Sequence, residues 1–232
     1  MRTALFALTV GGAALADRLA GAVEGSVTVN LPDRLRSSAG STAHDTVYFE
    51  RLGDVMREAF TRYDALICVM ATGIVVRMIA PYVENKLYDP AVLVFDEAGR
   101  HGISLLSGHI GGANELTRKL CAAVGADPVI TTATDVTGML APDAIAARLA
   151  LRPVPKSAIQ VLNTALLEGK EIAYYIASDL PHAAFYEAQL RAEEVQARLF
   201  RGAIPSVGAD EYRVIITAAD DLPQENAPRT LY

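Results

Sequence analysis

Several features that define whole classes of protein are scarce or missing in this sequence. It contains no tryptophan and two cysteines, and it has no run of about 18 apolar residues that could span a membrane. Lysine and arginine number 21 against 27 aspartates and glutamates, and the net charge of -6 leaves no general basic field for nucleic acid. These absences exclude a disulfide scaffold and argue against membrane and nucleic-acid partners. An anionic ligand would need a local cluster of Arg, Lys and backbone N–H groups.

Both cysteines, Cys68 and Cys121, lie in apolar stretches and have no second Cys or His at metal-ligand spacing. We interpret them as small buried hydrophobic residues of a protein in a reducing compartment. The short apolar run at residues 4–10 is followed by two glycines and then by apolar residues at helical spacing. This pattern indicates a strand, a turn and a helix rather than a signal peptide, so we predict a cytoplasmic protein.

Apolar segments of strand length alternate with segments of helical period over much of the chain. This alternation predicts an α/β fold with a doubly wound, mostly parallel sheet covered by helices on both faces. One connection differs, because residues 96–99 suit a tight turn between two apolar strands, so residues 91–106 are predicted to form a β-hairpin. The expected strands lie at residues 3–10, 26–30, 65–70, 91–95, 102–106 and 128–131.

A change of composition predicts two domains. Two prolines and a loss of periodicity at residues 151–157 mark a linker. We therefore predict a first α/β domain at residues 1–150 and a smaller α/β domain at residues 158–219. Residues 220–232 are polar and contain prolines, so we expect them to form a tail.

Three expected strand ends lead into loops of glycine and hydroxyl residues that precede helical patterns. In open parallel sheets, ligands bind beyond the carboxyl ends of the strands, where helix N–H groups also attract anions. Each loop alone could be a tight turn or a helix cap, but three together favour a binding site. We expect Thr72, His109 and Thr132 to line one cleft. The substrate-binding candidates in these loops are Thr72, Gly73, Ser107, Gly108, Gly111, Gly112, Asn114, Thr131 and Thr132.

The longest of these loops matches neither common phosphate-binding pattern, because no Gly-Lys-Ser/Thr follows and its glycines lack the dinucleotide-binding spacing. Its distinguishing residue is His109, which lies between glycines at an expected helix entrance. An imidazole there can meet a ligand and exchange a proton near neutral pH, so His109 is the candidate catalytic residue. His44, His101 and His182 are interpreted as structural or solvated.

Four charged residues near these loops each have two interpretations. Glu115 could act in catalysis or complement the dipole of the helix that it begins. Asp135 could hold a catalytic histidine or cap a turn. Arg77 and Lys86 could recognise a carboxylate or be solvated surface charges.

Long stretches of the sequence resemble the CbiG family of cobalamin biosynthesis, the cobalt-precorrin-5A hydrolases. The segment Leu-Leu-Ser-Gly-His-x-Gly-Gly-Ala-Asn at residues 105–114 is the most specific. The resemblance covers nearly the whole first domain, and the second domain looks like the middle region of the family. The other matching residues and strings are 72–77, 79–81, 86, 89–92, 96–97, 104, 115–116 and 128–135.

The resemblance implies an enzyme of the anaerobic branch that opens the δ-lactone of a ring-contracted cobalt corrinoid and releases acetaldehyde. It implies no cofactor of the protein's own, because the cobalt belongs to the substrate. Set against this chemistry, His109 is expected to be the base, and N–H groups near Gly111 and Gly112 the oxyanion donors. Arg77 and Lys86 are expected to hold carboxylates of the anionic corrinoid.

Full-length members of the family continue into a third, C-terminal domain, so we expect a separate C-terminal domain or neighbouring pathway enzymes as partners. A hypothesis from another class is a non-catalytic corrinoid-binding or assembly module that needs such a domain. A third interpretation, a sugar-phosphate- or nucleotide-binding domain, is supported only by the glycine-rich loop.

Overall fold

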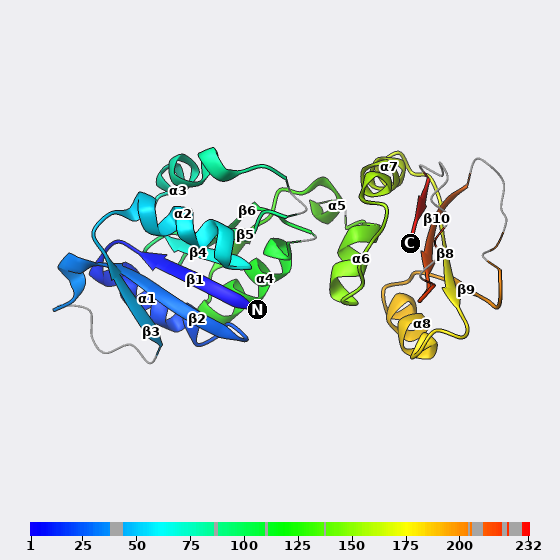
Figure 1. Ribbon diagram of the computed structural model, residues 1–232, viewed down its shortest axis with the longest axis horizontal. Helices are drawn as coiled ribbons and strands as arrows, with labels where there is room; N and C mark the ends of the chain where they lie inside the picture. The colour runs from blue at the N-terminus through cyan, green and yellow to red at the C-terminus, as the bar shows by residue number, and fades with distance from the viewer. Residues whose placement is uncertain are drawn as a thin grey trace. The chain divides into compact units, whose positions relative to one another are not determined.

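The computed structural model describes residues 1–37, 44–85, 88–109, 111–136, 138–203, 205, 211–219, 222 and 229–232. The chain divides into two compact units, Met1–Thr131 and Thr132–Tyr232 (Figure 1). No helix in the part of the chain that the structure describes has the length and apolar character to cross a membrane.

Within the described residues of the first unit, seven strands form one sheet in the order β3-β2-β1-β4-β5-β6-β7. Strands β1 to β5 run parallel, and the chain winds in one direction from β1 to β3 and in the other from β4 onward. The predicted doubly wound α/β fold is therefore confirmed. The strands are β1 Arg2–Ala7, β2 Ser26–Pro32, β3 Asp45–Phe49, β4 Ala65–Val69, β5 Ala91–Phe95, β6 His101–Leu106 and β7 Asp127–Val129.

Helices cover both faces of this sheet, because each carries an apolar stripe that is buried against the strands. Helices α1 (Val10–Ala20) and α4 (Ala113–Val124) pack on one face, and α2 (Leu52–Arg62) and α3 (Thr72–Ile79) pack on the other (Figure 1). Both cysteines are buried and unpaired, as predicted. Burial raises the pKa of the Cys68 thiol to about 12. Short 3-10 helices, Asp33–Leu35 and Ala80–Tyr82, follow β2 and α3.

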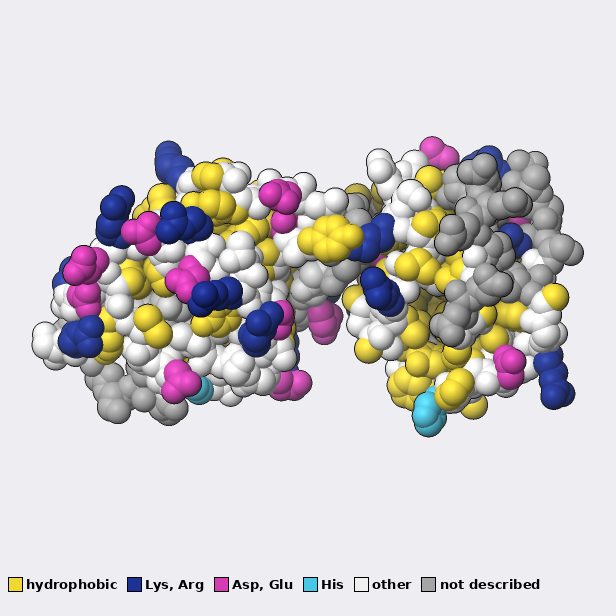
Figure 2. Space-filling view, in the orientation of Figure 1, with side chains coloured by type: hydrophobic (Ala, Val, Ile, Leu, Met, Phe, Trp, Pro, Cys, Tyr) yellow, Lys and Arg dark blue, Asp and Glu magenta, His cyan; other side chains and the backbone are white. Residues whose placement is uncertain are grey.

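Charged side chains on the outer surface of α2 form ion pairs along the helix. Asp54 contacts Arg51 and Arg57, and Glu58 contacts Arg62. On the face of the first unit shown in Figure 2, basic and acidic side chains are intermixed. Positive charge on this helix is therefore balanced locally.

Strands β5 and β6 form the predicted hairpin, with Val94 opposite Ile103 and Val92 opposite Leu106. Strand β7 pairs parallel with β6, so β6 and β7 run against the other five strands. The ends of the strands form two edges of the sheet. The carboxyl ends of β6 and β7 therefore lie at the opposite one of these two edges from the carboxyl ends of β1, β4 and β5.

Asp96 organises the hairpin turn. Its carboxylate accepts backbone hydrogen bonds from Ala98 (2.9 Å), Arg100 (3.0 Å) and His101 (2.7 Å). Partial burial raises the pKa of this carboxyl, but the N–H donors, with His101 the strongest, lower the pKa by more. The pKa of Asp96 therefore lies below its usual range.

Asp96→Asn is expected to reduce the free energy of unfolding at neutral pH and to lose this effect in acid. Because the folded-state pKa is depressed, the stabilisation is fully present above the unfolded-state pKa of about 4 and is lost as the pH falls through the folded pKa. Urea unfolding of both proteins across this pH range measures the difference. A difference that does not change with pH would contradict this role.

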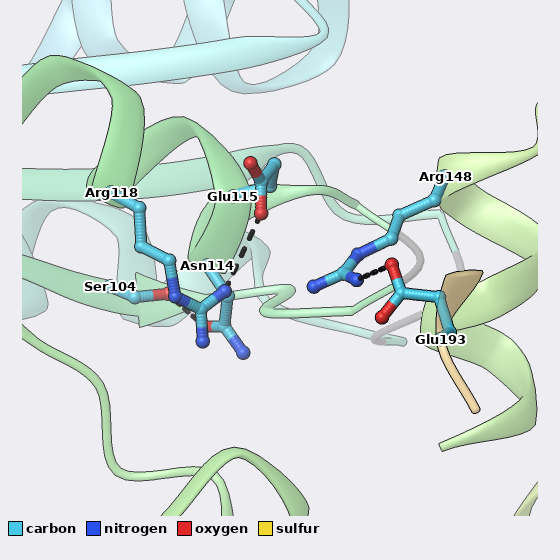
Figure 3. A network of polar contacts seen from close by, with 6 residues as sticks. All are labelled: Ser104, Asn114, Glu115, Arg118, Arg148 and Glu193. Atoms are coloured by element: carbon cyan, nitrogen blue, oxygen red, sulfur yellow. Dashed lines mark hydrogen bonds and ion pairs between the residues drawn. The ribbon is translucent and has the colours of Figure 1, made fainter. Parts of the chain in front are cut away.

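In the second unit, the described strands form a parallel four-stranded sheet in the order β11-β10-β8-β9. Helix α7 packs against β8, β10 and β11, and α8 packs against β8 and β9. Arg148, in α6, forms an ion pair with Glu193 at 2.6 Å (Figure 3). The elements are α5 Ala133–Val136, α6 Pro142–Arg148, α7 Lys156–Leu167, β8 Ile172–Ala177, α8 Ala183–Ala192, β9 Ala197–Phe200, β10 Tyr212–Ile216 and β11 Thr230–Leu231.

The division between the units lies before the predicted linker. Residues 132–150, expected at the end of the first domain, contain α5 and α6, which contact α7 and so belong to the second unit. The expected tail at residues 220–232 also departs from the prediction, because it includes β11, which pairs with β10. Tyr232 exchanges two backbone hydrogen bonds with Val154, at 2.8 and 2.6 Å. Pairing partners far away in the sequence thus hold residues 230–232 in place.

Candidate functional site

The hairpin separates two groups of residues that were expected in one cleft. Thr72 begins α3 directly after β4, at the edge where β1, β4 and β5 end. Ser107 and His109 follow β6, whose last residue, Leu106, pairs with Val92 at the start of β5. At about 3.3 Å per residue, the two ends of β5 lie roughly 15 Å apart. The expectation that Thr72 and His109 share a cleft is wrong, because β6 runs antiparallel to β5.

The edge that carries Thr72 holds a cavity of about 390 Å³. The cavity lies where the winding of the chain changes direction between β1 and β4, and polar residues, among them Thr9, Glu97 and His101, line it together with apolar ones. His101 therefore lies beside Thr72. Arg77 also belongs to this end of α3, because its guanidinium donates to the carbonyl of Gly73 at 2.9 Å. Thr72, Gly73 and Arg77 are not brought together with His109.

The opposite edge carries the glycine-rich loop, residues 107–114, between β6 and α4. Backbone hydrogen bonds close this loop, among them Gly112 N–H to the His109 carbonyl (2.8 Å) and Asn114 N–H to the Gly108 carbonyl (2.9 Å). The N–H of Gly112 is thus engaged inside the loop. The expectation that it donates to an oxyanion is wrong for this conformation.

Close packing inside the loop requires glycine at position 111. A Cβ there would lie 2.4 Å from the Ser107 Cβ and 2.7 Å from the Ser107 carbonyl oxygen, well inside contact distance. The next residue, Gly112, directly precedes α4 and has a φ of +78°, a backbone conformation that residues other than glycine disfavour. These two glycines fold the chain tightly back on Ser107 and leave His109 at the turn.

Ser107 is buried, with 8% of its surface exposed, and its φ of +58° lies in the left-handed region. Its Oγ donates to the Asp89 carbonyl at 3.0 Å, so the hydroxyl expected to bind substrate is used inside the protein. Asp89 is also buried, and its carboxylate accepts N–H bonds from Glu84 and Asn85 at 3.0 to 3.3 Å.

The start of α4 completes this edge (Figure 3). Asn114 is buried, and its Oδ1 accepts a hydrogen bond from the Ser104 hydroxyl at 2.7 Å. Glu115, with 64% of its side chain exposed, forms an ion pair with Arg118 at 3.5 Å. His109 is half-buried. Asn114 therefore holds the helix entrance, while His109 and Glu115 reach the surface.

The remaining candidates are distributed over both units. Thr131 follows β7 and so lies at the same edge as Ser107. Thr132 and the α5 residue Asp135 are half-buried parts of the second unit. Lys86 lies outside the described residues. Among the described residues, no group of three or more His, Cys, Asp and Glu side chains is arranged to hold a metal ion.

Two family models match the chain: "Cobalamin synthesis G N-terminal" over residues 54–135 and "Cobalamin biosynthesis central region" over residues 140–232. The chain belongs to the CbiG family. Its glycine-rich loop lies within the first CbiG region, and most of the second unit lies within the second.

Two curated relatives show how far the CbiG similarity extends. The chain is 40% identical over 234 residues to the cobalt-precorrin-5A hydrolase of Salmonella typhimurium, which covers 97% of this chain and 61% of that protein. It is 60% identical over 77 residues to the cobalt-precorrin-5A hydrolase of Priestia megaterium, which covers 33% of this chain and 21% of that protein. The chain thus spans about three fifths of the Salmonella protein.

A solved structure of a cobalamin biosynthesis protein G homolog from Sulfolobus solfataricus is similar to this CbiG chain in fold. The match has a TM-score of 0.50 at 18% identity and covers 99% of this chain and 58% of that chain. At this identity, the likeness concerns the fold alone.

Two residues that support the candidate site were not identified as such from the sequence. Asp89 and Ser104 are polar residues beside or within apolar strands, a position that signals a buried hydrogen-bonding role. Asp89 also precedes Pro90, where a side chain that bonds nearby N–H groups is common. These signals could have identified both residues as supports of the loop.

Proposed function

We propose that this chain acts as a cobalt-precorrin-5A hydrolase, which opens the δ-lactone of the corrinoid and releases its two-carbon fragment as acetaldehyde. The observation that supports the proposal best is the glycine-rich loop, which presents a half-buried histidine at a sheet edge. The two curated relatives, at 40% and 60% identity, are named for this activity.

His109 is the base in this proposal. It takes a proton from water as the water oxygen attacks the lactone carbonyl, and it returns this proton to the ring oxygen as the ring C–O bond breaks. The products are a carboxylic acid, which ionises at neutral pH, and a free hydroxyl. The neutral His109 then takes the hydroxyl proton, the aldehyde C=O bond forms, and the C–C bond to the macrocycle breaks. The electron pair of that bond passes into the conjugated cobalt macrocycle. The cobalt belongs to the substrate, and the prediction of no further cofactor stays a prediction.

An acidic protein must hold an anionic corrinoid with local cations. Arg77 lies at the other edge of the sheet, where its guanidinium bonds to Gly73, so it is not placed to assist His109. Arg118 is a further candidate cation, which the sequence did not single out. It lies in α4, shortly after the loop, and 38% of its side chain is exposed. We include Arg118 in the proposed corrinoid site.

The proposal is tested by mixing the purified chain with cobalt-precorrin-5A and measuring acetaldehyde with alcohol dehydrogenase and NADH, while the corrinoid absorption spectrum is recorded. We expect release of acetaldehyde together with a spectral change. A spectral change without acetaldehyde would mean that this chain is a binding module, and the absence of both would contradict the proposal. Chain that has been unfolded by heat is the control. The cytoplasmic location stays a prediction.

A further inference from the structure

A buried serine attaches the first part of the loop that carries His109 to the residue before β5. The Ser107 hydroxyl donates to the Asp89 carbonyl, just before β5 begins. The Asp89 carboxylate in turn accepts N–H bonds from Glu84 and Asn85. The Asp89 N–H also donates to the Asn85 carbonyl at 2.9 Å, so hydrogen bonds of both the side chain and the backbone hold the residue whose carbonyl accepts from Ser107.

Movements of Ser107 are transmitted directly to the rest of the loop. The Ala113 N–H, at the first turn of α4, donates to the Ser107 carbonyl at 3.2 Å. Gly111 lies so close that a Cβ there would overlap with the Ser107 Cβ. Each contact joins Ser107 to a residue on the other side of His109 in the sequence, so the position of Ser107 affects the position of His109.

The backbone of Ser107 is unusual in a way that points to function. A φ of +58° is costly for a residue with a Cβ, and glycine would adopt it at little cost. Such strained conformations persist where the surrounding structure holds them and occur often at functional sites. Serine at this position adopts the strained conformation and, unlike glycine, has a hydroxyl that donates to the Asp89 carbonyl.

We propose that Ser107 and Asp89 are a positioning pair, which holds the turn so that His109 has one orientation toward the substrate. This inference rests on the proposed function of His109. Neither residue needs to touch the corrinoid, because Ser107 acts through the loop and Asp89 acts through Ser107.

Ser107→Gly separates positioning from folding. Glycine removes both the backbone strain and the hydrogen bond to Asp89, so the midpoint of thermal unfolding should stay unchanged or rise. We expect kcat to fall about tenfold or more with little change in KM, because a misplaced catalytic group affects the chemical step. Ser107→Ala keeps the strain and loses the hydrogen bond, so it should lose both stability and kcat. Ala150→Gly is the matched control, because Ala150 also has a positive φ, of 54°, but lies in the second unit.

A measurement that needs no turnover keeps this inference separate from the proposed function. In ¹⁵N NMR spectra of the full chain, Ser107→Gly should broaden or shift the His109 ring signals and speed exchange of the Gly112 and Ala113 amide protons about tenfold or more. Ala150→Gly should change neither. If the wild type shows no turnover, the proposed function fails, and the NMR result alone then tests whether Ser107 positions His109. If Ser107→Gly leaves the ring signals, the amide exchange and kcat unchanged, the positioning role is overturned.

Discussion

His109→Ala is expected to lower acetaldehyde release by about a hundredfold or more, the usual contribution of a positioned proton-transfer group. His109 lies on a half-buried turn at the surface, so its truncation should leave the fold and the spectral change on corrinoid binding nearly unaltered. The measurement is the coupled acetaldehyde assay at saturating substrate, with thermal unfolding as the check of folding.

His101→Ala is the control for this prediction, because the hairpin places His101 at the other edge of the sheet. It should keep the turnover of the wild type. Acetaldehyde release at the wild-type rate by His109→Ala would remove His109 from catalysis and leave Glu115 and Asp135 as the next candidates. Glu115 is the more accessible of the two, since its side chain is exposed beside Arg118.

Gly111→Ala is expected to reduce turnover about as strongly as His109→Ala does and also to destabilise the first unit. The added Cβ would overlap with the Cβ and carbonyl oxygen of Ser107, and both belong to the strained residue that anchors the loop. The overlap can be relieved only if the loop opens, and this opening should lower the free energy of unfolding by about 1–3 kcal/mol. Urea unfolding and the acetaldehyde assay measure the two effects.

Gly53→Ala is the matched control for this substitution. Gly53 lies in α2, where a Cβ would meet the Met78 sulfur at 3.8 Å, an ordinary contact. This variant should keep full turnover and be equally or slightly more stable, because alanine favours helix over glycine. Normal stability and turnover in Gly111→Ala would show that the loop tolerates opening and that its tight packing is irrelevant to function.

The fold could be predicted well where the pattern of one segment decides its structure. The buried strands β1, β4 and β5 are continuous apolar runs, and Asp96 with Gly99 indicated the hairpin turn. Strand β3 was missed because it lies at the sheet edge and alternates exposed and half-buried residues. Strand β11 was missed because pairing with distant β10, rather than its own composition, makes it a strand.

The sequence indicated individual residues of the candidate site but not where the fold places them. His109 and its glycines could be singled out because a histidine between glycines at a helix entrance is unusual. The expectation that they share a cleft with Thr72 uses the rule that ligands bind beyond the carboxyl ends of parallel strands. This rule does not apply to β6, because the hairpin makes β6 antiparallel to β5. The contact of Ser107 with Asp89 could not be predicted, because it depends on a side-chain hydroxyl meeting a backbone carbonyl 18 residues away in the sequence.

The pairing of Tyr232 with Val154 and of β11 with β10 has a consequence for the order in which the chain folds. During synthesis from the N-terminus, every strand of the first sheet is available once Val129 has emerged from the ribosome. The second sheet cannot gain its edge strand β11 until residues 230–231 have been translated, and closing such distant contacts is intrinsically slow. The loop with His109 is therefore formed early, while the second unit is still being made.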